Sequence, residues 1–407
     1  MLNYLYPAIF GLGLMATPVM AGQSAVVSLD SAASLVRSNN PDLAAARLRI
    51  DEAQGRHKQA GRLANPELEA GMEQNAAFRE GKLEFGFTQR FPVTARLRLE
   101  KIVTATEVKS AEAEIREMER QWIARAREGV VKVLAIRQRR ELLKQQSTLA
   151  NEFAGFLAGI AGKGEGSIVD AGQAKLEAAS LAVDIHLLDA EELAILGELK
   201  PLLGIQPGTD LLVGGVLKEP VMPKASVDPQ ARPDYQMAGY EAEAAAASVA
   251  LEQARRRDDI EGGVFAGADR SEDVPEGFDT EAIVGVRLKV PLPLWNRNEG
   301  AIDEARAKHQ RMEMERAALA RTIHLEAETA RVSMQHWATV ITNIKTTLMP
   351  LADEQAALAE QTYRNGQGEI QSVLRAREKR TALAIAGLEA LREFNLARVR
   401  HDAATGK

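Results

Sequence analysis

The chain has 407 residues, of which 45% are hydrophobic, 27% are charged and only 4% are aromatic, and it contains no cysteine. Much of the apolar content is alanine, and a mixture of Ala, Glu, Arg, Lys and Leu is typical of long helices or coiled coils. The formal net charge of −6 predicts no general affinity for nucleic acid. The lack of cysteine excludes disulfides, thiolate metal sites, cysteine nucleophiles and an acylated N-terminal cysteine.

Residues 1–21 are typical of a signal peptide, with an apolar stretch from Leu2 to Met20 and a small residue, Ala21, at the expected cleavage position. A short membrane anchor is the alternative, because no Lys or Arg precedes the apolar stretch. After Ala21 no apolar run approaches the ~18–20 residues of a transmembrane helix. We therefore expect an exported chain.

The first half, residues 22–218, predicts a helix over 42–64, a β-hairpin over 66–91, a very long helix over 94–161 and a tight turn over 162–167. A further helix follows over 167–203. The 67 steps of the long helix (161 − 94) correspond to roughly 100 Å, and the two shorter helices together nearly match that length. We expect them to stack end to end against it. We expect a pillar of this shape to have no globular core and to pack laterally against other copies of the chain.

Residues 219–231 read as a proline-containing linker, and residues 232–407 repeat the first half. Asn40-Pro41-Asp42 corresponds to Arg232-Pro233-Asp234 at an offset of 192 (233 − 41). Later in the chain, Gly164 corresponds to Gly366 at an offset of 202 (366 − 164). The repeat predicts a second hairpin over 260–290, a long helix over about 298–363 with a kink at Pro350, a tight turn over 364–369 and a last helix.

The four strands alternate between an apolar and a polar face, and each approaches the ~9–11 residues of a tilted strand that crosses a bilayer. A membrane does not tolerate open sheet edges, and a single-chain barrel needs at least ~8 strands. We therefore expect several chains to close one barrel; two soluble hairpins packed on helices are the alternative. The lipid-facing residues would be Leu68, Met72, Leu83, Phe85, Phe87, Val264, Val284, Val286 and Leu288.

No enzyme motif is present. The six histidines form no i, i+4 pair and no HExxH motif, the chain has no G-x-S-x-G elbow, and the glycine-rich turn at 162–167 lacks the GK[ST] ending of a phosphate loop. We therefore predict no catalytic residue, no metal site and no cofactor.

The two glycine turns would lie together at the far tip of the pillar, where a partner could dock, although plain turn chemistry is the alternative. The docking residues would be Lys163, Gly164, Gly166, Ser167, Arg364, Asn365, Gly366 and Gly368.

The chain resembles the TolC family of outer membrane efflux proteins. The resemblance rests on the two N/R-P-D helix starts, on Asn65-Pro66-Glu67-Leu68, on Pro291-Leu-Pro-Leu-Trp-Asn-Arg-Asn298 and on the tip patterns Gly164–Asp170 and Tyr363-x-x-Gly366. The Leu-Trp-Asn-Arg-Asn stretch resembles the heavy-metal efflux branch, although no metal-binding segment accompanies it.

The resemblance implies a homotrimer that is mainly α with a small β part: an α-barrel of coiled-coil helices continued by a twelve-stranded β-barrel in the outer membrane of a Gram-negative bacterium, with the helices in the periplasm. It implies an exit duct of a tripartite pump, served by a periplasmic adaptor and an inner-membrane pump of the RND type. In some members, acidic residues after the second tip narrow the end of the tunnel; here Ser372 and Arg375 occupy those places, and Asp170 matches the acidic position after the first tip. These three residues are the candidates for a constriction. A secreted coiled-coil scaffold or adhesin without channel activity is the alternative.

Overall fold

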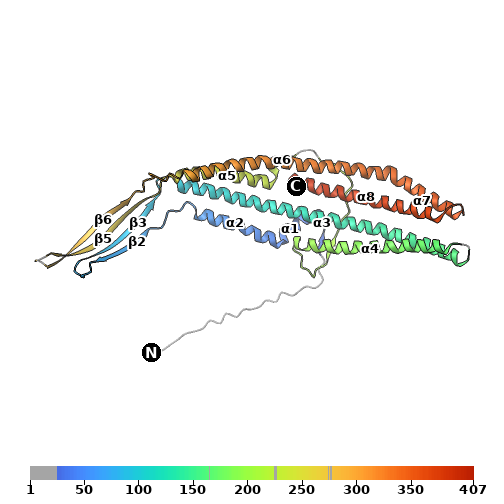
Figure 1. Cartoon of the computed structure of the whole chain (residues 1–407), viewed down its shortest axis with the longest axis horizontal. Coiled ribbons are helices and arrows are strands. Elements are labelled where there is room, and N and C mark those ends of the chain that lie inside the picture. Colours follow the sequence, from blue (N-terminus) through green and yellow to red (C-terminus); the bar gives the residue numbers. More distant parts are fainter. Residues whose placement is uncertain (1–24, 165, 224–226, 274, 276) are drawn as a thin grey trace, which may run out of the picture.

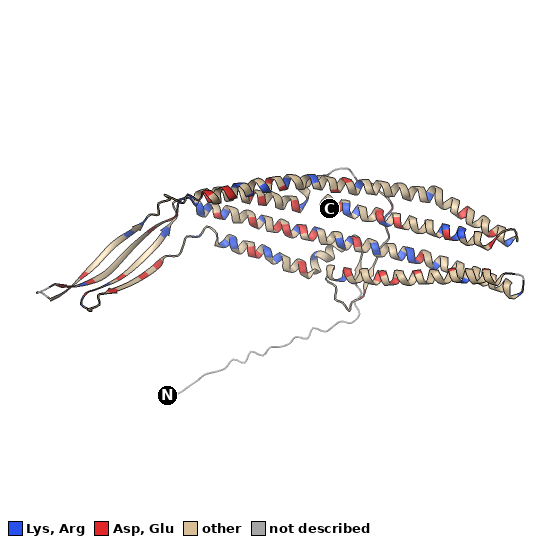
Figure 2. Cartoon of the chain, viewed as in Figure 1, with Lys and Arg blue, Asp and Glu red and all other residues tan. Residues whose placement is uncertain are grey.

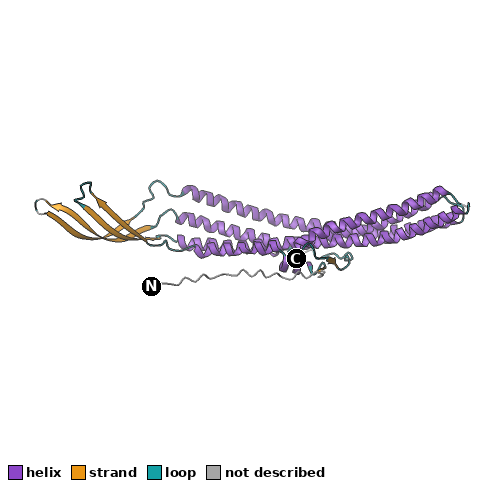
Figure 3. Ribbon diagram, turned by 90° about the horizontal axis from the view of Figure 1, so that it is seen from below, coloured by secondary structure: helices purple, strands orange, loops and turns teal. Residues whose placement is uncertain are grey.

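The computed structural model describes residues 25–164, 166–223, 227–273, 275 and 277–407. The expected signal peptide, residues 1–21, lies outside these residues, as do three residues of the linker. The chain forms a long, gently bent bundle of helices with a β-sheet at one end (Figures 1 and 3). The expectation of a mainly α fold with a small β part is confirmed. None of the described helices has a stretch apolar enough to span a bilayer.

Two long helical pillars organise the bundle. The first is α3 (Arg96–Gly162), whose 67 residues span about 100 Å. The second consists of α6 (Glu299–Asn343), a π-helical segment (Ile344–Leu348) and α7 (Met349–Arg364). The π-helical segment ends at Leu348, two residues before Pro350. The sequence predicts a kink at this proline because proline has no N–H to continue the helical hydrogen bonds.

The shorter helices stack end to end alongside the long ones, as expected (Figure 1). The pair α2 (Pro41–Gln59) and α4 (Ile168–Leu202) runs along α3, and the pair α5 (Pro233–Ala254) and α8 (Ile370–Ala404) runs along the second pillar. Asn40 caps α2 by accepting a hydrogen bond from the backbone N–H of Leu43 at 2.8 Å, and Pro41 occupies the first helical position. A short helix, α1 (Ala32–Asn39), precedes α2, and a 3-10 turn (Pro229–Ala231) precedes α5.

The helix boundaries follow the sequence repeat. The offset of 202 carries the first residue of α4, Ile168, onto the first residue of α8, Ile370, and both helices contain 35 residues. The offset of 192 carries Pro41 onto Pro233, the first residue of α5. Equal lengths and equivalent starts are what an internal duplication would leave.

The main sheet has four antiparallel strands in the order β2-β3-β5-β6. These are β2 (Glu67–Gln74), β3 (Gly81–Phe91), β5 (Ile260–Asp273) and β6 (Gly277–Lys289). The two hairpins therefore join through β3 and β5 and leave β2 and β6 as the edges.

The largest buried cluster lies at the middle of the bundle, so the expectation of a pillar without a core is wrong. Two short strands, β1 (Ala25–Val27) and β4 (Leu211–Val213), pair in parallel there and pack with α1, α3, α4 and α8. Val27, Val36, Val130 and Leu203 are fully buried in this cluster. Arg137 fastens β4 to the bundle, since its guanidinium donates to the carbonyl of Val213 and to Glu192.

Candidate membrane face and helical tips

The strand register brings the apolar side chains into rows on one face of the sheet. One row runs Leu68–Phe87–Val264–Val286 across all four strands. The neighbouring row runs Ala70–Phe85–Ala266–Val284. Because side chains on a strand alternate between faces, these rows form one continuous apolar surface.

All nine residues expected to face lipid are exposed on this surface in the isolated chain. Val284 and Val286 are the most exposed, at 82% and 83%, and Leu83 is the least, at 43%. None of the described helices covers the sheet (Figure 1). Contiguous exposed apolar surface of this kind marks a contact with a membrane or a protein.

The opposite face of the sheet is polar and cross-linked by ion pairs. Arg287 on β6 reaches across the sheet to Glu84 at 2.6 Å and Glu69 at 3.0 Å. Phe265 is the aromatic exception on this face, and the guanidinium of Arg287 lies 5.4 Å from its ring centre. The ring occupies the space over Gly285, where an added Cβ would approach it to 2.4 Å. A face of this composition suits contact with water.

The first tip turn joins α3 to α4. Gly164 adopts a φ of +78°, which favours glycine. Ser167 then caps α4, accepting a hydrogen bond from the N–H of Asp170 at 3.3 Å. Lys163, Gly166 and Ser167 are exposed.

The second tip turn joins α7 to α8 and also contains a left-handed glycine, but its N-cap residue, Glu369, makes no side-chain cap hydrogen bond. Gly366 adopts a φ of +73°, and the N–H of Gln367 donates to the carbonyl of Thr362 at 3.1 Å. Arg364, Asn365 and Gly368 are exposed. The structure places both turns at the same end of the bundle, opposite the sheet (Figure 1).

A small cluster of side chains joins the two helical hairpins behind the tips. The rings of Phe153 and Tyr363 meet edge to face at 6.2 Å between centres. The guanidinium of Arg377 stacks 4.2 Å from the centre of Phe153 and pairs with Glu360 at 2.7 Å, and Arg364 binds the same carboxylate at 2.7 Å. Four helices thus contribute to one packed unit at this end.

The three constriction candidates do not form one site within a single chain. Asp170 is half-buried, while Ser372 and Arg375 are exposed on α8. Among the described residues, no hydrogen bond or ion pair joins Asp170 to either of them. Asp170 instead lies near Tyr363, whose pKa is raised by burial and, to a smaller extent, by this carboxylate.

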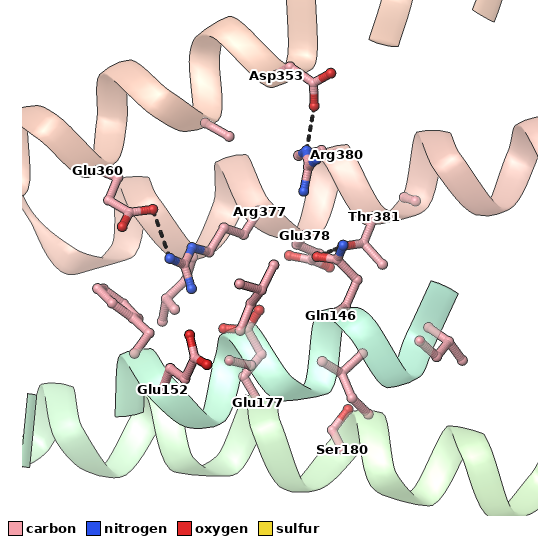
Figure 4. A pocket seen from close by; sticks show the side chains of 18 of the residues that line it. Gln146, Glu152, Glu177, Ser180, Asp353, Glu360, Arg377, Glu378, Arg380 and Thr381 are labelled. Atoms are coloured by element: carbon pink, nitrogen blue, oxygen red, sulfur yellow. Dashed lines mark hydrogen bonds and ion pairs between the residues drawn. The ribbon is translucent and has the colours of Figure 1, made fainter. Parts of the chain in front are cut away.

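A hollow of about 930 Å³ lies just behind the tip between α3, α4, α7 and α8 (Figure 4). Carboxylates of Glu152, Glu177 and Glu378 line it together with Arg377 and Arg380. Burial raises the pKa of Glu177, Glu378 raises it further, and Arg377 opposes the rise. The sequence carries no signal for this hollow, because its walls come from two helical hairpins, α3–α4 and α7–α8, that are far apart in the chain.

The comparisons with known proteins agree with this geometry. Residues 229–407 match the family model of outer membrane efflux proteins. The second half of the chain is therefore similar to this family. No curated protein sequence matches the chain.

Three solved structures of membrane proteins share the fold over nearly the whole chain. CusC matches with a TM-score of 0.78 and 17% identity, over 99% of this chain and 98% of its own. VceC from Vibrio cholerae matches with a TM-score of 0.73 and 20% identity, over 93% and 96%. The MtrE outer membrane channel of Neisseria gonorrhoeae matches with a TM-score of 0.74 and 15% identity, over 93% and 89%. The match of the family model covers only the second half, whereas the shared fold includes both halves.

Proposed function

We propose that the chain is the outer-membrane exit duct of a tripartite efflux pump. Three copies would close a twelve-stranded barrel in the outer membrane, and their helices would continue it as a tunnel into the periplasm. A periplasmic adaptor would meet the helical tips, and an inner-membrane pump, of the RND type by family resemblance, would deliver the substrate. The duct itself would be passive, with no enzymatic activity.

The exposed apolar face of the four-stranded sheet carries this proposal. Leaving Val284, Val286 and Leu68 in water would forgo most of the ~1.5–3 kcal/mol that each large apolar side chain contributes when buried. Lipid would cover this face without further protein. The polar face, with Arg287, Glu69 and Glu84, would then line a water-filled lumen, as in other membrane barrels.

The free edges of the sheet support assembly from several copies. Strands β2 and β6 each have one partner, and a bilayer offers no water for the unpaired backbone groups of an edge. Pairing β6 of one copy with β2 of the next removes every edge when the ring closes. Such a head-to-tail contact closes a ring instead of forming an open filament when the rotation fits.

The two outer sides of the helical bundle support the same ring. On the side of β2, α4 exposes Leu176, Val183 and Leu187 at helical spacing. On the side of β6, α6 and α7 expose apolar residues in the same way: Leu325, Val332, Leu351 and Leu358. Packing one side against the other would bury both rows and extend the barrel contact along the helices.

The tips support the adaptor contact. Exposed polar and basic residues, Lys163, Ser167, Arg364 and Asn365, surround two glycine turns that a packed cluster holds in place. Asp170, Ser372 and Arg375 would narrow the tunnel only where copies meet, because one chain does not bring them together.

The test is to purify the mature protein in detergent, measure its oligomeric mass, and record conductance in planar bilayers. We expect a trimer that forms ion-conducting pores. A monomer that stays in solution without detergent and does not conduct would contradict the duct and favour a secreted scaffold. Replacing Lys163 and Arg364 by glutamate should weaken adaptor binding without changing conductance.

A further inference from the structure

The polar face of the sheet changes the sign of its charge along the strands. On this face, the row nearest the hairpin turns that spans all four strands contains three acidic residues and one basic residue: Glu73, Asp269, Glu281 and Lys82. The row nearest the helices contains two basic residues and one acidic residue: Arg90, Lys289 and Glu261. Figure 2 shows Lys and Arg at this end, between the sheet and the bundle. The chain as a whole has a net charge of −6, so the positive end does not follow from composition.

A hollow of about 520 Å³ lies at this positive end, where β3, β5 and β6 meet the helices. We call it the junction hollow. Its walls contain three carboxylates and five basic side chains, which are Arg90, Arg96, Arg255, Arg257 and Lys289. The formal charge of the walls is therefore +2 (5 − 3) in each chain. Because the strand register places Arg90 and Lys289 on the polar face, the hollow lies on the side of the sheet opposite the apolar rows.

Arg90 and Lys289 are only loosely paired with acidic groups. Both share the carboxylate of Glu261, at 3.5 Å from Arg90 and 3.9 Å from Lys289. Arg90 also lies 3.4 Å from Glu67. These distances exceed the roughly 2.7–3.2 Å of an ordinary N–H···O hydrogen bond. Both side chains therefore keep N–H donors for another oxyanion.

The guanidinium of Arg257 is the least neutralised group of the junction hollow. Arg257 is exposed, and in the described part of the chain no carboxylate lies within ion-pair distance of it. The nearby wall carboxylate of Asp259 is held by Arg96 at 2.6 Å. Folding of the chain thus leaves the positive charge of Arg257 available to a ligand.

The chemistry of these walls suits anions with carboxylate or phosphate groups. A guanidinium binds such groups through two parallel hydrogen bonds, and a lysine adds a point charge. Basic side chains arranged around a pore are typical of pores for anions and phosphates. The volume of the hollow is within the range of about 300–1,000 Å³ of sites for small organic molecules, so an organic anion would fit.

We propose that the junction hollow is a binding site for anionic solutes inside the duct, at the passage from the helical tunnel to the barrel. This inference rests on the proposed function, because only a closed ring of copies makes the polar face a lumen. Three copies would place three hollows around the passage, with a formal charge of +6 (3 × 2). Anionic substrates that arrive from the tips would be concentrated here before they reach the acidic row near the strand turns.

The test records the current through single trimers in planar bilayers while inorganic tripolyphosphate is added. An anion bound in the passage lowers the current, and the dependence on concentration gives an apparent Kd. The wild type is compared with Lys289→Gln, with Arg257→Gln/Lys289→Gln and with a control, Lys82→Gln. Neither Lys289 nor Arg257 has a carboxylate within hydrogen-bond distance among the described residues, so we expect these variants to fold.

The control removes the same charge from the same face at the other end of the sheet. Lys82 lies eight residues from Arg90 on β3 (90 − 82), about 27 Å at ~3.4 Å per residue. This separation exceeds the Debye length of about 10 Å in 0.1 M salt, so Lys82→Gln should leave the Kd unchanged. A charge contact at about 4 Å in water corresponds to about a five-fold change in affinity. We therefore expect the Kd to rise about five-fold in Lys289→Gln and roughly 25-fold in the double variant.

An unchanged Kd in the double variant would overturn the proposal, as would an equal rise in Lys82→Gln or a wild type that tripolyphosphate does not affect. Calorimetric titration of the same detergent-purified proteins with tripolyphosphate repeats the comparison without conductance. A protein that binds tripolyphosphate through these residues but forms no pores would contradict the proposed duct. Normal pores whose tripolyphosphate binding does not depend on Arg257 and Lys289 would contradict the site alone.

Discussion

The membrane face can be tested with two neighbouring residues on one strand. Val284 and Ile283 are both β-branched, follow each other on β6, and point to opposite faces of the sheet. Val284 belongs to the apolar row with Phe85 and is 82% exposed in the isolated chain. Ile283 pairs with Gly267, whose other neighbour is Glu84 on the polar face. Each is replaced by arginine.

The two substitutions should differ only if lipid covers the apolar face. In water, arginine at a position as exposed as Val284 would change stability by no more than about 0.5 kcal/mol. Near the middle of a bilayer, arginine on a lipid-facing strand costs about 2–4 kcal/mol. Three copies in one barrel would therefore lose about 6–12 kcal/mol, comparable with the whole stability of a typical domain. Arginine at position 283 would instead enter the lumen, near Glu84.

The assay measures the amount of trimer in the outer membrane fraction and the conductance of the purified protein. We expect Val284→Arg to lose most of the inserted trimer and Ile283→Arg to keep it. Insertion of both variants at wild-type levels would refute the lipid-facing surface, and loss of both would show that the effect does not depend on the face.

Three further predictions concern the helices. Gly164→Ala should lower the midpoint of thermal unfolding, because a left-handed residue with a side chain costs about 1–2 kcal/mol, whereas Gly172→Ala, inside α4 with open space around it, should raise the midpoint. Phe394→Ala should cost about 3–5 kcal/mol in unfolding experiments, since this ring is fully buried beside Met334. Glu177→Gln should stabilise the protein at neutral pH and lose this advantage as the pH falls. The pKa of Glu177 is raised because its charged form is less stable in the folded protein than in water. This loss of stability is present above the folded pKa and disappears below the ordinary glutamate pKa of about 4.3. A Glu177→Gln variant whose stability tracks the wild type at every pH would contradict this reading of the hollow behind the tip.

The strands and tips could be predicted because their signals are local. Alternation of Leu83, Phe85 and Phe87 with polar residues predicts one face of β3 without knowledge of its partners. Glycine spacing at Gly164 and Gly366, carried by the repeat, predicts both turns, and the offset between them also relates α4 to α8. The start of α2 at Pro41 follows from its cap, Asn40.

The mid-length core could not be predicted because it depends on contacts between distant segments. Strand β1 has three residues, Ala25–Val27, too few for a periodic pattern, and its partner β4 begins at Leu211. Neither segment can be recognised as a strand without its partner. The same holds for the hollow behind the tip, where Glu152 and Glu378 come from opposite halves of the chain. Helical periodicity shows which side of each helix is apolar, but not which helices surround a space.

The internal duplication also predicts the strand register between β6 of one copy and β2 of the next. Within one chain, the last strand of the first half pairs with the first strand of the second half, and Phe87 lies opposite Val264. The sequence offsets of the repeat (293 − 92 = 201 and 233 − 41 = 192) carry Phe87 onto Leu288 of β6 and Val264 onto Met72 of β2. If copies meet as the two halves do, Leu288 of one copy lies opposite Met72 of the next. Both residues belong to the apolar face, so this pairing continues the lipid-facing rows around the barrel.

Cysteine pairs can test this register directly, since the chain has no cysteine of its own. Opposite residues on neighbouring antiparallel strands bring their Cβ atoms to about 4.5–5.5 Å, and oxidation needs little further approach. Leu288→Cys combined with Met72→Cys should give covalent dimers and trimers on a non-reducing gel. Leu288→Cys combined with Gly71→Cys should not, because adjacent residues of β2 point to opposite faces. Equal cross-linking of the two pairs, or none in either, would contradict a ring in which the contact between copies repeats the contact between the halves.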